Sequence, residues 1–234
     1  MAVVSVSFGF SAAANAQTVA VDTKDSVTTT VKQLVADNPG VTAGQIRQEL
    51  TRYAKEKGIT FETAVREAAK ESSQHRSNKT LSSGGGKADK AIGKGKNKGD
   101  VFYSPVSTAG ITHGHSGIYY TEKKIVEAPG PGKKVRNTEH TNVKVAKNSK
   151  KQHVNTTQAK RDKAANKANT FVGRSYNYLF VANKTSNGAM NCSQVVWVGY
   201  KDGSGIDLDS NGGPGVYPSD ILNSSWTKTY ETIS

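Results

Sequence analysis

A glycine- and lysine-rich stretch at residues 79–98 divides this chain of 234 residues into two parts with different patterns. The stretch has no apolar periodicity, which is typical of a flexible, solvated linker. Helix-forming patterns come before it and strand-forming patterns come after it. We therefore expect a small helical segment followed by one larger domain, and the length of the chain fits that organisation.

Three short amphipathic helices are predicted over residues 24–78. The first ends at the Asn-Pro-Gly sequence of residues 38–40, because proline and glycine do not continue a helix. A capping-box pattern from Thr42 to Gln45 opens the second helix, and Gly58 ends it. The apolar positions repeat at helical spacing in all three, so these helices can pack on one another or on the larger domain.

The larger domain, residues 99–234, mixes strand and helix patterns, so the predicted fold class is α+β. Strands are expected at residues 100–104, 115–120 and 125–128. A helix is expected at residues 160–169. The apolar run at residues 194–200 fits a short buried helix or strand.

Charge is the most unusual feature of the composition. The 32 Lys and Arg residues outnumber the 19 Asp and Glu residues, which gives a net charge of +13. Such a charge favours anionic partners, either nucleic acid, anionic lipid or an anionic cell-wall polymer. The lysines lie in Gly/Asn/Lys tracts with little aromatic interleaving, so specific nucleic-acid recognition is not expected.

The first residues of the chain indicate the cellular location of the protein. An apolar run over residues 2–10 is followed by small residues in an Ala-x-Ala arrangement, which resembles the second half of a secretory signal peptide. Residues 1–17 are therefore interpreted as a signal-peptide remnant, with cleavage after Ala16. A basic start is missing, and the alternative is a frayed N-terminal strand. We expect a secreted or cell-wall-associated protein without a membrane span, because no apolar run reaches the length needed.

The single cysteine, Cys192, excludes an internal disulfide and is the candidate nucleophile. It stands directly before an apolar, helix-capable run, which places it at a helix N-terminus. The backbone N–H groups there favour a thiolate and could also receive an oxyanion. The alternative is that Cys192 is a small buried hydrophobic residue.

A thiolate nucleophile needs a base, and a histidine base needs an acceptor that orients it. His115 starts a predicted strand, and Glu127 is a carboxylate within the next, otherwise apolar strand. With a three- or five-residue turn Glu127 lies opposite Gly117 and diagonal to His115, whereas a regular four-residue turn places it on the wrong face. Spacing alone leaves both pairings open. His75, His140 and His153 are expected to be solvated surface residues, whereas His113 would share the face of His115 if the strand extended that far.

Four short motifs, in chain order, carry a resemblance to a known family. They are Gly-Asp-Val-Phe-Tyr at 99–103, His-Ser-Gly-Ile-Tyr at 115–119, Ile-Val-Glu-Ala at 125–128 and Asn-Cys-Ser-Gln-Val-Val-Trp at 191–197. Together they resemble the permuted papain-like proteins of the YiiX/YaeF and YycO type, circularly permuted relatives of NlpC-type cell-wall peptidases. The resemblance covers about residues 99–222 and leaves the helical segment outside.

The resemblance implies a papain-like core in which a cysteine-bearing helix packs on an antiparallel sheet. It implies that Cys192 is the nucleophile, His115 the base and Glu127 the residue that orients the imidazole, while Asp100 caps backbone N–H groups. The expected function is that of a secreted cysteine amidase or peptidase acting on bacterial cell-wall peptide. Alternatives are a thiol acyltransferase or lipid hydrolase, and a non-catalytic wall-binding module. No metal or other cofactor is expected, since His113 and His115 are the only close ligand pair.

Overall fold

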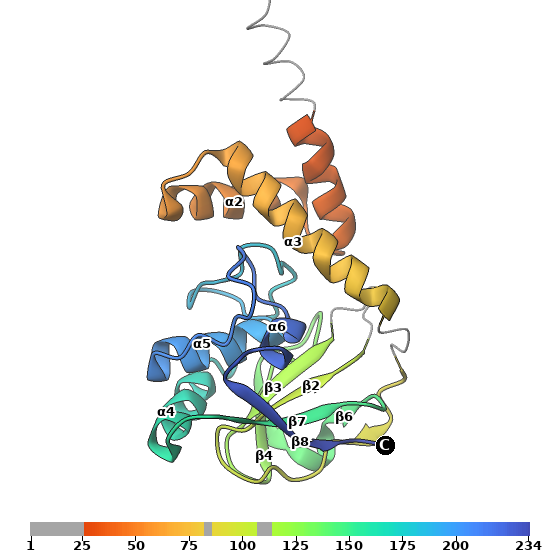
Figure 1. Cartoon of the computed structure of the whole chain (residues 1–234), viewed down its shortest axis with the longest axis vertical. Coiled ribbons are helices and arrows are strands. Elements are labelled where there is room, and N and C mark those ends of the chain that lie inside the picture. Colours follow the sequence, from red (N-terminus) through yellow and green to blue (C-terminus); the bar gives the residue numbers. More distant parts are fainter. Residues whose placement is uncertain (1–25, 82–85, 107–113) are drawn as a thin grey trace, which may run out of the picture.

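The computed structural model describes residues 26–81, 86–106 and 114–234. The interpreted signal-peptide remnant at 1–17 and the side chain of His113 lie outside the described residues. Within the described part, helices and one antiparallel sheet form an α+β fold (Figure 1). No helix of that part is both long enough and apolar enough to cross a membrane.

The helical segment forms as the sequence predicts. Residues 26–37 are helical, and α2 (Ala43–Lys57) and α3 (Phe61–Leu81) follow. Thr42 and Gln45 cap the start of α2 reciprocally, and Gly58 ends it in the left-handed conformation that glycine adopts without strain. Figure 1 shows this segment, coloured red to yellow, lying across one end of the sheet domain.

The sheet has six antiparallel strands in the spatial order β5-β4-β3-β2-β7-β8. Their bounds are β2 (Val101–Ser104), β3 (His115–Tyr119), β4 (Lys124–Glu127), β5 (Arg136–Glu139), β7 (Lys150–Val154) and β8 (Thr227–Thr232). A short pair, β1 (Lys90–Ala91) and β6 (Lys144–Val145), lies beside it, with the 3-10 turn η1 (His140–Asn142) between β5 and β6. The predicted strands after residue 99 are thus confirmed as β2, β3 and β4.

Two helices, α4 (Gln158–Asn169) and α5 (Cys192–Ser204), pack on one another and on the sheet, and the short α6 (Pro218–Leu222) follows. The close α4–α5 contact depends on Gly199, because a Cβ there would lie only 3.0 Å from the carbonyl oxygen of Ala164. The shared apolar core includes Val101, Ile118 and Val195, all fully buried. The apolar run at 194–200 is therefore helical and fixes the position of the α5 N-terminus.

The expectation of a flexible linker over residues 79–98 is wrong for the residues that the structure describes. Helix α3 continues to Leu81, and Ile92 is fully buried beside the sheet. Asp100 accepts hydrogen bonds from the backbone N–H groups of Lys96 (3.1 Å) and Asn97 (2.9 Å), which confirms its predicted capping role. Glycine and lysine content alone could not reveal this order, because it comes from contacts with the sheet.

A second apolar cluster joins the helical segment to the sheet domain. Ile46, Leu50 and Ala68 pack there with Leu179 and Val181, which come from the loop before α5. The helices therefore pack both on one another and on the larger domain. This packing brings α3 close to α6, a contact that matters for the sites described below.

The fully buried Leu50 provides a stability test of this cluster. Leu50→Ala should lower the free energy of unfolding by about 2–5 kcal/mol, since it removes buried methyl groups and leaves a cavity. Gln48→Ala, at an exposed position of the same helix, should change it by less than about 0.5 kcal/mol. Urea unfolding followed by circular dichroism measures both. Equal effects of the two substitutions would contradict the packing of α2 on the domain.

Candidate active site

Cys192 is the first residue of α5, as its sequence context predicts. The Asn191 side chain accepts a hydrogen bond from the backbone N–H of Gln194 (2.9 Å), and the Gln194 side chain accepts one from the N–H of Asn191 (3.2 Å). This reciprocal capping box fixes the start of the helix. The thiol therefore lies at the positive end of the helix dipole.

The β3–β4 hairpin brings His115 and Glu127 together. Tyr120 donates a backbone hydrogen bond to the carbonyl oxygen of Lys124 (2.8 Å), which closes a three-residue turn. Ile118 pairs with Val126, so Glu127 lies opposite Gly117, on the same face of the sheet as His115. Of the two pairings that spacing left open, the structure has the one with the odd-length turn.

The contact between these two side chains is short and buried. His115 Nε2 lies 2.6 Å from Glu127 Oε2, and only 2% of the Glu127 side chain is exposed. Phe102 packs edge-on against the His115 ring at 5.5 Å, and a Cβ at Gly117 would overlap the Phe102 ring. Gly117 therefore gives Phe102 the space it needs to hold the imidazole against Glu127.

Cys192 is the other polar side chain that acts on the His115 ring. Because Nε2 is engaged by Glu127, Nδ1 is the atom left for the thiol. Burial alone would lower the pKa of His115, but the interactions with Cys192 and Glu127 outweigh it and raise this pKa to about 10. The imidazole is therefore held as an imidazolium, the partner that a thiolate requires.

Arg136 completes the site, and sequence reasoning missed it. Its Nε and Nη2 donate to Glu127 Oε1 at 2.9 and 2.6 Å. Burial would raise the pKa of Glu127, but the contacts with His115 and Arg136 prevail and lower it. Arg136 pairs directly with Glu127 across β4 and β5, a register that its basic, apparently solvated sequence context did not indicate.

The thiol is covered in this structure. Cys192 is 2% exposed and clusters with Phe180 and Tyr217, two stacked rings whose centroids lie 5.4 Å apart. The His75 ring of α3 stacks on Tyr217, with 3.7 Å between centroids. The helical segment therefore reaches the aromatic cover of the candidate nucleophile.

His75 is not the solvated residue that the sequence suggested. Its side chain is 12% exposed, and its neighbours are Asp220 of α6 and Glu71, one helical turn earlier on α3. Burial raises the pKa of Glu71 to about 8 and that of Asp220 to about 7. No local pattern indicated this cluster, because Asp220 lies 145 residues beyond His75 and meets the two α3 residues only through the docking of α3.

Comparison with known proteins identifies the family. The uncharacterized protein YycO of Bacillus subtilis (strain 168) is 33% identical to this chain in an alignment over 211 residues, with 86% of each protein covered. This chain belongs to the same family as YycO. Among solved structures, the crystal structure of metalloprotein yiiX from Escherichia coli O157:H7 matches with a TM-score of 0.45 and 16% identity, covering 58% of this chain and 97% of that chain. No family model matches this chain.

Proposed function

We propose that this protein is a cysteine hydrolase that cleaves an amide bond by way of a thioester intermediate. The observation that carries the proposal is the buried chain of contacts from Cys192 through His115 to Glu127, with 2.6 Å between the last two. Nucleophile, base and orienting carboxylate follow one another as a thiol hydrolase requires. The order along the chain, histidine strand before cysteine helix, agrees with the permuted papain-like arrangement, which forms part of the proposal.

The chemistry follows from these contacts. The Cys192 thiolate attacks the carbonyl carbon, and the oxyanion that forms lies near the N–H groups at the start of α5. His115 gives its proton to the leaving amine, the C–N bond breaks, and an acyl-thioester remains. Water then attacks the thioester while His115 takes a proton from it, which releases the carboxylic acid and restores the thiolate.

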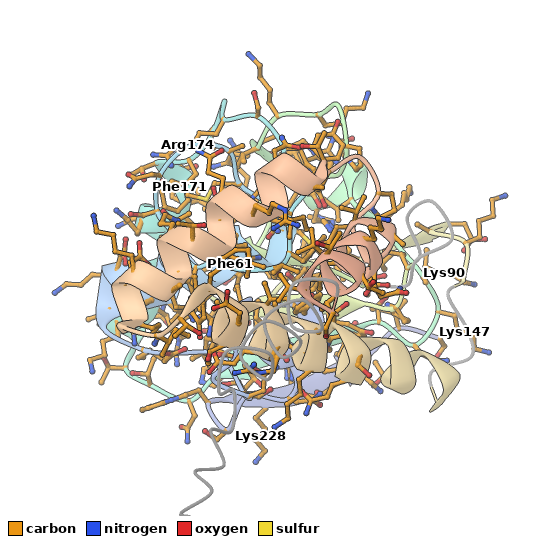
Figure 2. The ribbon with its side chains drawn as sticks, turned by 90° about the horizontal axis from the view of Figure 1, so that it is seen from above. Phe61, Lys90, Lys147, Phe171, Arg174 and Lys228 are labelled. Atoms are coloured by element: carbon orange, nitrogen blue, oxygen red, sulfur yellow. The ribbon has the colours of Figure 1, made fainter. Side chains whose placement is uncertain are left out.

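The proposed substrate is the peptide of bacterial cell wall, and the proposed location is outside the cell. The net charge of +13 supports retention on anionic wall polymers. Lys90, Lys147 and Lys228 project from different parts of the ribbon into solvent, as Figure 2 shows from above. These exposed lysines are accessible to an anionic polymer.

The test is hydrolysis of purified cell-wall peptides, with products identified by mass spectrometry. The proposal expects one new amine and one new carboxylic acid per cleaved bond, and a thioester on Cys192 when the reaction is stopped early with acid. Transfer of the acyl group to an alcohol or amine would instead favour an acyltransferase. Binding of wall fragments without any turnover would favour the wall-binding module.

Glu127→Gln should lower kcat/KM by about 10–100-fold. This decrease is smaller than the one expected when Cys192 or His115 is replaced. The amide can still accept a hydrogen bond from the imidazole, so orientation suffers but proton transfer remains possible. Without the carboxylate charge, the pKa of His115 should fall, because that charge helps to raise it. A pH profile of kcat/KM measures this shift. An unchanged profile would show that Glu127 does not act through His115.

A further inference from the structure

A second group of ligand-type side chains lies beyond the aromatic cover of Cys192. Glu71 and His75 of α3 and Asp220 of α6 each present one oxygen or nitrogen atom, and these three atoms lie within 4.8 Å of one another. His75 Nε2 and Asp220 Oδ2 are 3.6 Å apart. An ion at the centre of such a triangle lies within about 2.8 Å of each atom, so small side-chain shifts give the roughly 2.0–2.2 Å of zinc–ligand bonds.

The surrounding residues orient this group as the outer shell of a metal site does. Ser219 Oγ lies 3.1 Å from His75 Nδ1, which turns Nε2 toward the two carboxylates. The stack on Tyr217 fixes the plane of the imidazole ring. Asn211 Nδ2 donates to Asp220 Oδ1 at 2.9 Å. A ligating histidine held through its second nitrogen, beside a hydrogen-bonded carboxylate, is the usual arrangement at protein metal sites.

Glu71 supplies an independent indication that a cation binds here. The residue is 3% exposed, and its Oε2 accepts a hydrogen bond from the backbone N–H of Gly215 (2.8 Å). Its other oxygen, Oε1, is buried and accepts no hydrogen bond from any described residue. Such an oxygen is costly to bury unless a cation or a donor satisfies it.

The nearby lysine does not fill this role, and a path from solvent exists. Lys184 donates to Asp209 and to the carbonyl oxygen of Gly213, and no ion pair joins it to Glu71 or Asp220 among the described residues. Glu71 also lines a cavity of about 440 Å³ between α2, α3 and the loop at residues 211–214. An ion could therefore enter from this cavity.

We propose that Glu71, His75 and Asp220 bind one divalent transition-metal ion, best matched by Zn²⁺. One imidazole and two carboxylates suit zinc, and three protein ligands leave a fourth position for water. The ion links α3 to α6 and thereby fastens the helical segment to the sheet domain. Because His75 stacks on Tyr217, it also fixes the aromatic cover of Cys192.

The test is titration of Zn²⁺ into metal-free Cys192→Ala protein. Isothermal titration calorimetry measures the binding, and elemental analysis measures the amount of bound zinc. Cys192 is replaced because a thiol beside His115 could itself bind zinc. We expect one equivalent of bound zinc. At a hundredfold excess over its dissociation constant, zinc should raise the melting temperature by about 5–10 °C.

His75→Phe is the decisive variant, since phenylalanine can keep the stack on Tyr217 but cannot bind a metal. In the same Cys192→Ala background it should weaken zinc binding at least 100-fold and remove the thermal shift. The melting temperature without metal shows whether the variant folds. Glu71→Gln and Asp220→Asn, which keep the side-chain shapes, provide the same test should His75→Phe not fold.

His140→Ala, a histidine outside the cluster, should bind zinc as the parent does. Equal zinc affinity in His75→Phe and its parent would overturn the proposal. Absence of saturable binding by the parent up to about 0.1 mM zinc would overturn it as well, since such affinity is too weak for a site built by the fold. Neither outcome depends on catalytic activity, because every protein in the comparison lacks Cys192.

Discussion

Cys192→Ala is expected to lower cleavage of cell-wall peptide by about 10⁴-fold or more, while the protein remains folded. No other thiol exists in the chain, so no second nucleophile of this kind can substitute. Members of a catalytic group that act as a unit each cause nearly the full loss when removed. His115→Ala should therefore cause a loss of similar size, because the thiol then lacks its proton partner.

Kinetics of the purified variants, with melting temperatures measured in parallel, check this expectation. His140→Ala provides the matched control, since no hydrogen bond or ion pair joins His140 to Cys192, His115 or Glu127 in the described structure, and it should keep the parent's kcat/KM. Activity that survives in Cys192→Ala would refute the thiol mechanism. A loss of activity in His140→Ala as large as that in His115→Ala would show that His115 has no special role.

Alkylation of Cys192 by iodoacetamide is expected to proceed already near pH 6 and to become at least about 10-fold slower there in His115→Ala. An ordinary thiol ionises near pH 8.5 and reacts little at pH 6. Here an imidazolium beside the sulfur stabilises the thiolate, and the raised pKa of His115, about 10, keeps that imidazolium protonated at neutral pH. Rates measured by mass spectrometry from pH 5 to 10 provide the profile.

The shape of the profile carries the test, because the cover over Cys192 slows alkylation at every pH. A rate that rises tenfold per pH unit up to about 8.5, in parent and His115→Ala alike, would contradict the ion pair.

Turnover should fall as the pH approaches 10, since the imidazolium that protonates the leaving amine is then lost. The contribution of His115 to the free energy of unfolding also decreases as the pH rises. A raised histidine pKa stabilises the fold fully below about pH 6.5, and this contribution is lost as the pH rises toward 10.

Much of the local structure could be predicted because it depends on neighbours in the sequence. The capping box at Thr42 and the stop at Gly58 require only residues within one helical turn. The placement of Cys192 at a helix start likewise follows from the polar residue before an apolar run. The His115–Glu127 contact was only half predictable. The residues were identified, but the turn that aligns them had two possible lengths, and backbone hydrogen bonding selected one.

By itself, the sequence determined the capped start and the glycine stop of α2, the strands of the β3–β4 hairpin, and the candidate nucleophile with its two partners, since each depends on local pattern or on a short motif. Only the tertiary structure decided that Arg136 holds Glu127, because that contact needs the β4–β5 register. It also decided that residues 86–98 are ordered against the sheet. The cluster of Glu71, His75 and Asp220 exists for the same reason, since packing of apolar faces far apart in the chain sets the docking of α3, and no local pattern encodes it.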